Sequence, residues 1–136
     1  MSVLRVDHTA IVVEDLDAAI PRWLMILGAQ RNGSVSRDVV ATQHVEIAMI
    51  AVGDTRIELI RPTDAESGVA RFLAKHGESL HHVGLEVDDI NEEMEQAVRD
   101  GMRLIDSQPR MSPHGWVAFV HPGSTGGVLV EFIQKA

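Results

Sequence analysis

The stretch that decides the fold is "DHTAIVVEDLDAAI" at residues 7–20, because "HHVGLEVDDINEEM" at residues 81–94 repeats its pattern. Aligning the two stretches at an offset of 74 residues places His8 against His82 and one aspartate against another further along. Self-similarity at a fixed offset is typical of a duplicated structural unit. The sequence therefore predicts two copies of one unit.

Each copy is expected to contain the same elements in the same order. It opens with a strand of alternating apolar residues and continues into a helix with apolar residues at helical spacing. The first helix should begin after Asp15, end at Gly28 and be irregular at Pro21, and the second should run from Asp89 to Gly101. The runs "VEIAMIAVGDTRIELI", "MRLID" and "WVAFVHPGSTGGVLVEFI" then read as strands and turns.

This order, a strand, a helix and three strands, predicts an α+β fold. One such unit cannot close its own sheet, so we expect two tandem βαβββ modules packed into one curved mixed sheet with helices outside. The expected single domain spans residues 1–136, with module one at about 1–62 and module two at about 79–136. A linking helix is expected within residues 63–78, where apolar residues follow helical spacing.

Composition excludes several classes of function. The chain has 136 residues without cysteine or tyrosine, which excludes disulfides, thiolate metal sites, cysteine nucleophiles and phenolic acids. A net charge of −8 with scattered basic residues argues against nucleic-acid binding. No apolar run approaches the roughly 20 residues of a membrane span. The start "MSVLRVDH" lacks the features of a secretory signal, so we expect a cytoplasmic protein.

The repeat also places one carboxylate in the last strand of each copy. Glu58 follows His8 by 50 residues and Glu131 follows His82 by 49 residues. Pseudo-twofold packing would bring these side chains to one point. An ionised carboxylate in an apolar strand costs several kcal/mol without a partner, which favours a cation there. Two imidazoles and two carboxylates suit one six-coordinate divalent ion, such as cobalt, manganese, nickel, zinc or iron.

A structural interpretation competes with the metal hypothesis at each position. A single histidine on an apolar strand more often packs than binds metal, and Arg56 could pair with Glu58. The joint recurrence of histidine and glutamate favours the metal hypothesis. Of the adjacent histidines, His82 is the predicted ligand because it aligns with His8, whereas His81 should face the other way and pack or support.

Over nearly its full length the chain resembles the vicinal oxygen chelate superfamily, and within it the methylmalonyl-CoA epimerase family. The segments that carry the resemblance are "DHTAIVVEDLDAA", "RIELIRP", "VARFLAKHGESLHHVGLEVDDI" and "VAFVHPGSTGGVLVEFIQ". By this resemblance the metal ligands would be His8, Glu58, His82 and Glu131. The resemblance also implies a homodimer.

The implied reaction interconverts the 2R and 2S forms of an acyl-CoA by removal of the α-proton, with a metal acting as Lewis acid. Two acid/base groups are needed, and the resemblance implies Glu46 and Glu131. Glu46 precedes Glu58 by 12 residues, as Phe119 precedes Glu131, so the repeat predicts equivalent positions facing the cavity. The competing interpretation of Glu46 is an exposed strand residue.

The loops depart from the epimerase pattern. The turn "HPGSTGG" lacks the lysine that usually follows His-Pro, and "PRMSPHGW" lacks the basic residues often found there, which leaves the identity of the acyl-CoA open. The remaining basic candidates for the CoA moiety are Arg71, Lys75, Arg103 and Arg110. A glyoxalase-type isomerase or lyase on the same scaffold is the first alternative. A metal-free small-molecule binding protein is the second, and the His/Glu quartet argues against it.

Overall fold

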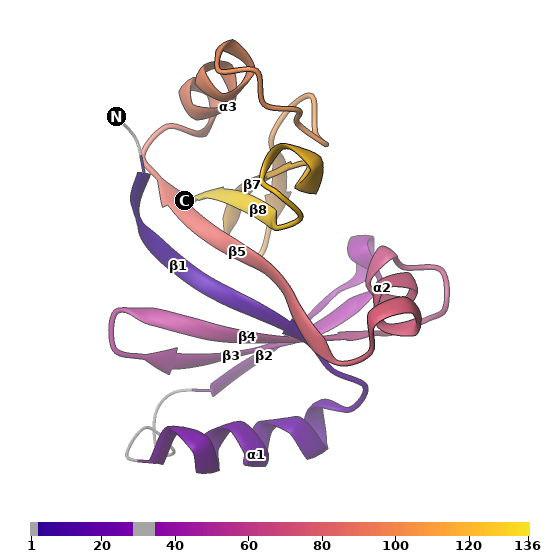
Figure 1. The fold of residues 1–136 in the computed structure, drawn as a ribbon. Coiled ribbons are helices and arrows are strands. Elements are labelled where there is room, and N and C mark those ends of the chain that lie inside the picture. Colours follow the sequence, from indigo (N-terminus) through magenta and orange to yellow (C-terminus); the bar gives the residue numbers. More distant parts are fainter. Residues whose placement is uncertain (1–2, 29–34) are drawn as a thin grey trace. The chain divides into compact units, whose positions relative to one another are not determined.

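The computed structural model describes residues 3–28 and 35–136 (Figure 1). The chain divides into two compact units. The first, here called the terminal unit, comprises Met1–His8 and His82–Ala136, and the second, the middle unit, comprises Thr9–His81. That residues 1–136 form a single domain with the expected module boundaries stays a prediction.

The elements follow the predicted order. They are β1 (Val3–Val12), α1 (Leu16–Leu27), β2 (Val35–Val40), the 3-10 helix η2 (Ala41–Gln43), β3 (Val45–Val52), β4 (Thr55–Pro62), α2 (Gly68–His76), β5 (Ser79–Val87), α3 (Ile90–Arg99), β6 (Arg110–Ser112), β7 (Gly115–Val120), the 3-10 helix η3 (Pro122–Ser124) and β8 (Leu129–Gln134). Hydrogen-bonded neighbours follow the order β2-β3-β4-β1-β5-β8-β7-β6. The β5–β8 pair is parallel and the β7–β8 pair is antiparallel, so the predicted α+β class with a mixed sheet is confirmed.

In the middle unit the two faces of the antiparallel strands β2, β3 and β4 carry separate apolar clusters. Helix α1 packs on one face, which includes Ala48, Ile50 and Leu59. Val69 of the linking helix α2 packs against the cluster that contains Ile47 and Met49. Successive strand residues point to opposite faces, so each face has its own set of neighbours.

Helix α1 begins where the sequence predicts. Asp15 is the N-cap, and its side chain accepts a hydrogen bond from the backbone N–H of Asp17. Gly28, with a φ of 60°, ends the helix. The irregularity expected at Pro21 is absent, because the helix is continuous over Leu16–Leu27. Pro21 is exposed, and the hydrogen bond it removes belongs to the carbonyl of the exposed Asp17, where water can replace it.

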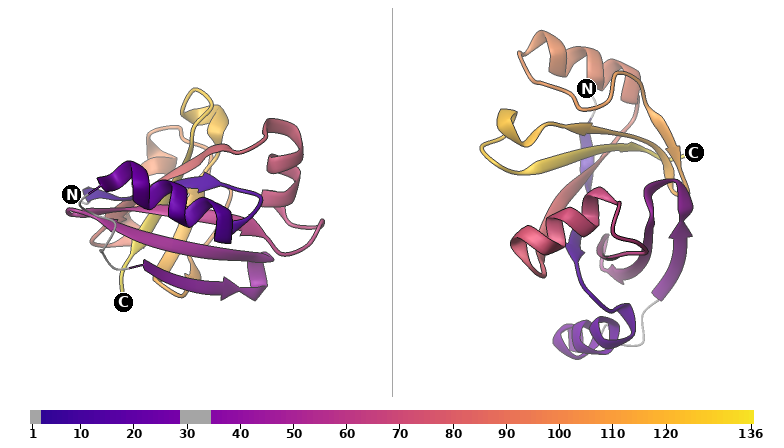
Figure 2. Two further views of the ribbon diagram at one scale, coloured as in Figure 1. Left: turned by 90° about the horizontal axis from the view of Figure 1, so that it is seen from below. Right: turned by 90° about the vertical axis from the view of Figure 1, so that its right-hand side faces the viewer.

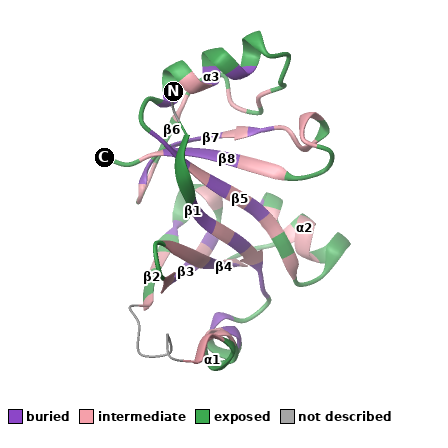
Figure 3. Ribbon diagram, turned by 60° about the vertical axis from the view of Figure 1, so that its left-hand side comes forward, coloured by how far each residue is buried: buried purple, intermediate pink, exposed green. Residues whose placement is uncertain are grey.

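In the terminal unit, helix α3 covers one face of the sheet. Figure 2 shows β7 and β8 side by side, joined through η3, and Figure 3 shows buried segments within β5 and β8. The apolar stripe of α3 is Ile90, Met94 and Ala97. Val98, which also follows Met94 at helical spacing, is 59% exposed, because Ala97 takes the buried place three residues after Met94.

Two further details differ from the sequence prediction. The run "MRLID" forms no strand, and Leu104 makes only an isolated bridge to Val120. The first of the three strands that follow the helix of the second copy is instead β6, which pairs with β7. No helix in residues 3–28 and 35–136 combines the length and apolar character needed to cross a bilayer.

The N-cap of α3 gives a test of the helix boundary. The Asp89 carboxylate accepts a hydrogen bond from the backbone N–H of Glu92 at 3.1 Å. We predict that Asp89→Ala lowers the free energy of unfolding by about 1 kcal/mol, measured by urea denaturation. The neighbouring Asp88→Ala is the control, and an equal loss in the two variants would contradict the assigned cap.

Candidate metal centre

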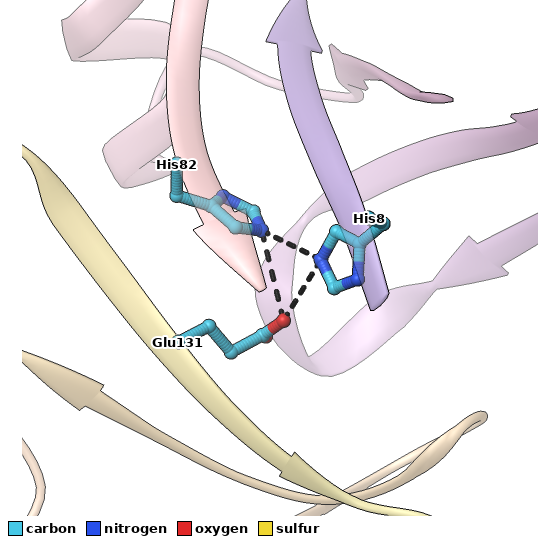
Figure 4. Close-up of side chains that lie close together, drawn as sticks. All are labelled: His8, His82 and Glu131. Atoms are coloured by element: carbon cyan, nitrogen blue, oxygen red, sulfur yellow. Dashed lines mark hydrogen bonds and ion pairs between the residues drawn. The ribbon is translucent and has the colours of Figure 1, made fainter. Parts of the chain in front are cut away.

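Three of the predicted ligands meet in the terminal unit. His8 of β1, His82 of β5 and Glu131 of β8 point toward one another (Figure 4). Nε2 of His8 lies 3.1 Å from Nε2 of His82 and 2.9 Å from Oε1 of Glu131, and the third distance, from Nε2 of His82 to Oε1 of Glu131, is 3.7 Å. The three residues are 2%, 5% and 8% exposed. Buried donor atoms from three strands therefore face one small space.

The register of the sheet explains this meeting. In the parallel pair β5–β8, Glu131 lies beside Gly84, two residues after His82, and therefore shares the face of His82. Gly84 is needed because a Cβ atom at this position would overlap with the imidazole ring of His8. A residue without a side chain thus makes room for the predicted ligand His8 of another strand.

The electrostatics of this group call for a cation. Nδ1 of His8 lies 2.7 Å from Oδ2 of Asp7, so it donates its proton there and presents a lone pair at Nε2. That lone pair faces a second imidazole nitrogen and a carboxylate oxygen. Metal–ligand bonds of about 2.1 Å that meet at about 90° place two ligand atoms about 3.0 Å apart. Two imidazoles and a carboxylate at the observed distances therefore fit one divalent ion.

Glu58, the fourth predicted ligand, belongs to the middle unit. It lies on β4 directly across from Met49 and is 7% exposed. Its face of the strands is otherwise apolar at Ile47 and Ile60. A buried carboxylate in such surroundings needs a positive partner, as the sequence argument assumed. Its place in the coordination shell stays a prediction.

The strand register contradicts the predicted equivalence of Glu46 and Phe119. Glu46 lies directly across from Arg61, whereas Glu58 lies across from Met49. Residues directly opposite in an antiparallel pair share a face, and the face changes at each successive residue. Glu46 and Glu58 therefore point to opposite faces of the β3–β4 pair, and Glu46 lies on the face that α1 covers.

The length of the two hairpins explains the error. Phe119 lies directly across from Glu131 in the β7–β8 pair, so its structural counterpart in module one is Met49 rather than Glu46. The β3–β4 hairpin closes through two residues, whereas the 3-10 helix η3 lengthens the connection between β7 and β8. An equal separation of 12 residues therefore does not give an equal register.

The contacts of Glu46 are those of an ion-pair cluster. Its Oε2 accepts a hydrogen bond from Arg37 at 3.0 Å, and its Oε1 accepts two from Arg61 at 3.2 and 3.3 Å. Arg37 also binds Asp17 of α1 at 2.6 Å. These two carboxylates raise the pKa of the Arg37 guanidinium, with Asp17 contributing most. These ion pairs connect β3 with β2, β4 and α1. Both carboxylate oxygens of Glu46 accept hydrogen bonds from arginines.

His81 has the packing role that the sequence suggested. Its ring meets the ring of Phe72 of α2 at a centroid distance of 4.8 Å and an interplanar angle of 78°. Burial lowers the pKa of His81 to about 4, so the imidazole is neutral near pH 7. The adjacent histidines of β5 thus lie in different environments: His81 packs against Phe72, and His82 faces His8 and Glu131.

Asp7 is the site residue that the sequence reading missed. It is 2% exposed and contacts His8 directly. Strict alternation along β1 would have sent the two side chains to opposite faces, yet both are buried. The signal that could have found Asp7 is a carboxylate next to a predicted histidine ligand, since such histidines commonly donate their second N–H to a carboxylate.

Gly84 provides a test of the arrangement. We predict that Gly84→Ala displaces the His8 ring, because the added methyl group overlaps with it. The variant should lose at least tenfold in Co²⁺ affinity, measured by chelator competition. Gly68→Ala, where the added methyl group would make only an ordinary contact with the side chain of Arg71 at 3.8 Å, is the control for a general glycine effect. Co²⁺ affinity in Gly84→Ala equal to that of the wild type would contradict the assigned packing.

Comparisons with known proteins agree with this architecture. The family model described as "Glyoxalase/Bleomycin resistance protein/Dioxygenase superfamily" matches residues 7–134. The human mitochondrial methylmalonyl-CoA epimerase is 37% identical over 133 residues, which cover 96% of this chain and 73% of the human protein. The ethylmalonyl-CoA/methylmalonyl-CoA epimerase of Cereibacter sphaeroides is 35% identical, with 96% of this chain and 97% of that protein covered.

A solved structure gives the same result. A methylmalonyl-CoA epimerase in complex with methylmalonyl-CoA and NH4+ superposes with a TM-score of 0.89 at 30% identity, covering 98% of this chain and 96% of that one. The resemblance seen in the sequence is confirmed by these matches over nearly the whole chain. The chain therefore belongs to the glyoxalase/bleomycin resistance protein/dioxygenase superfamily and, within it, to the methylmalonyl-CoA epimerase family of isomerases.

Proposed function

We propose that this chain is a metal-dependent epimerase that interconverts the 2R and 2S forms of an acyl-CoA, methylmalonyl-CoA being the preferred substrate. The observation that carries the proposal is the meeting of His8, His82 and Glu131 at distances that suit ligands of one cation. The names of the curated relatives, which act on methylmalonyl-CoA or on ethylmalonyl-CoA as well, support the substrate class.

The chemistry requires proton transfer at the carbon between the thioester and the carboxylate. A proton leaves one face of this carbon, negative charge moves onto the thioester oxygen, and a proton returns to the other face. A divalent ion held by His8, His82 and Glu131 would supply Lewis-acid stabilisation of that charge and bind the substrate's oxygens. With Glu58 as the predicted fourth ligand, a six-coordinate ion keeps two positions for those two oxygens.

Glu131 is the acid/base group that we assign to one face of the α-carbon. Its Oε1 lies 2.9 Å from Nε2 of His8, at the ligand position. A carboxylate has two oxygens, so one can bind the cation while the other exchanges a proton with the substrate. The opposite face needs a second group. The sequence predicts Glu46 for it, and the ion pairs of Glu46 with Arg37 and Arg61 argue against this role.

Among the basic residues considered for substrate binding, Arg110 is linked to the metal centre through ring contacts. Its Cζ lies 5.7 Å from the centroid of the Phe119 ring, and that ring meets His82 edge-on at 5.6 Å. Oδ1 of Asp106 lies 2.7 Å from Nε of Arg110. Arg71, in the middle unit, donates instead to the carbonyl of Glu66. We therefore assign the acyl-CoA's negative groups to Arg110 first.

The remaining sequence expectations stay predictions. These are a homodimer and a cytoplasmic location, together with the identity of the ion among cobalt, manganese, nickel, zinc and iron. A glyoxalase-type isomerase or lyase on the same scaffold would keep the ligands and differ in the reaction. The experiments below separate that alternative from an epimerase.

The central experiment follows hydrogen exchange at the α-carbon. We predict that the protein carries about one divalent ion per chain and catalyses exchange of the α-hydrogen of methylmalonyl-CoA in deuterated water. His82→Ala should lose both the ion and the exchange, while the exposed His76→Ala keeps both. Bound metal without exchange would favour the isomerase or lyase alternative, and stoichiometric metal in His82→Ala would contradict the ligand assignment.

Glu46→Gln decides between the two interpretations of Glu46. We expect its exchange rate to stay within a few-fold of the wild type and its free energy of unfolding to fall by about 1 kcal/mol, because the ion pairs are weakened. Arg37→Gln, which removes a partner of the same cluster, should behave alike. Loss of exchange by a hundredfold or more in Glu46→Gln alone would restore Glu46 as the base.

A further inference from the structure

A chain of charged groups leads away from His8 inside the terminal unit. The two oxygens of Asp7 divide between two partners. Oδ2 lies 2.7 Å from Nδ1 of His8, and Oδ1 lies 2.8 Å from Nζ of Lys135, just beyond the end of β8. The Asp7 side chain is 2% exposed, whereas that of Lys135 is 42% exposed. A buried carboxylate thus connects a ligand histidine to a cation at the surface.

The charges alternate along four groups, which are Asp7, Lys135, Glu86 and Arg5. Nζ of Lys135 also lies 3.7 Å from Oε1 of Glu86, and that oxygen accepts a hydrogen bond from Nε of Arg5 at 2.8 Å. Burying an ionised carboxylate is costly unless a cation and hydrogen bonds compensate it. Lys135 supplies the cation for Asp7, so the carboxylate can stay ionised in a nearly inaccessible place.

We propose that Asp7, compensated by Lys135, is the positioning residue that fixes the tautomer and ring orientation of His8 for metal binding. This inference rests on the proposed metal centre. An imidazole that donates its Nδ1 proton to a carboxylate must present its Nε2 lone pair on the opposite side of the ring, where His82 and Glu131 lie. Such support orients a ligand and increases its basicity, and its loss typically weakens metal binding 10- to 100-fold.

The repeat places different residues before the two histidines. The position equivalent to Asp7 in the second copy is His81, whose ring contacts Phe72. His82 has the Phe119 ring edge-on at 5.6 Å. The residue before His8 is thus a carboxylate, whereas the residue before His82 is itself a histidine. We therefore expect substitutions of Asp7 and Lys135 to change metal affinity, because they alter the charge beside His8 and the tautomer of its imidazole.

The first experiment measures metal affinity without any reaction. Co²⁺ affinity is determined by chelator competition for the wild type, Asp7→Asn, Lys135→Met and the double variant, at a temperature where circular dichroism shows each metal-free protein to be folded. We expect Asp7→Asn to weaken binding about 10- to 100-fold. Lys135→Met should also weaken binding, and the double variant should bind no more weakly than Asp7→Asn, because Lys135 acts through Asp7.

Matched controls use the same substitutions at exposed positions. Asp88→Asn and Lys75→Met, on the surface, should bind Co²⁺ as the wild type does. Wild-type affinity in Asp7→Asn, or effects of Asp7→Asn and Lys135→Met that simply add, would overturn the proposal. Failure of the wild type to bind Co²⁺ would instead overturn the metal centre itself, so the two failures are distinguishable.

A second experiment reads the tautomer directly. With ¹⁵N-labelled histidine and Zn²⁺, nuclear magnetic resonance should show His8 protonated at Nδ1 and coordinated through Nε2 in the wild type. In Asp7→Asn the Nδ1 proton should exchange faster with solvent, because a neutral amide oxygen is a weaker acceptor than a carboxylate. Coordination through Nδ1 in the wild type would overturn the assignment. A merely structural role of Asp7 would leave this signal unchanged.

Discussion

The electrostatic conflict among three buried donor atoms is the constraint on which the site depends. Two imidazole nitrogens and a carboxylate oxygen lie within 3.7 Å of one another, on residues that are at most 8% exposed. Lone pairs repel at such distances unless a proton or a metal ion lies between them, and one divalent ion relieves the repulsion among all three atoms at once. The donor set therefore makes sense as a site for a divalent ion, and the surrounding features support that arrangement.

The fold places these donors while keeping its apolar core elsewhere. Helix α3 covers the face of the sheet that carries Ala118 and Phe132, so the residues that alternate with them remain for the site. Glu131 and Phe119 face each other across β7 and β8 on that second face. Gly84 removes a side chain where the ring of His8 must fit. Core packing and site geometry thus use alternate residues of the same strands.

The repeat in the sequence was sufficient to bring together three of the four predicted ligands, because equivalent strand positions in the two copies point to equivalent faces of the sheet. His8, His82 and Glu131 were found in this way. The reasoning about Glu46 was wrong because residue counts across a hairpin depend on the length of its turn, which differs between the two copies. Asp7 was missed because alternation predicts opposite faces for neighbours, whereas β1 buries both Asp7 and His8. The length of a turn decided the first case, and tertiary contacts decided the second.

The most direct test of the central claim is X-ray absorption spectroscopy of the protein loaded with one Co²⁺ per chain. The account predicts two imidazole nitrogens together with oxygen ligands, at distances of about 2.0 to 2.2 Å. His8→Ala and His82→Ala, if they retain any ion, should each show one imidazole fewer. An ion bound without imidazole ligands in the wild type, or with both imidazoles retained in either variant, would contradict the account.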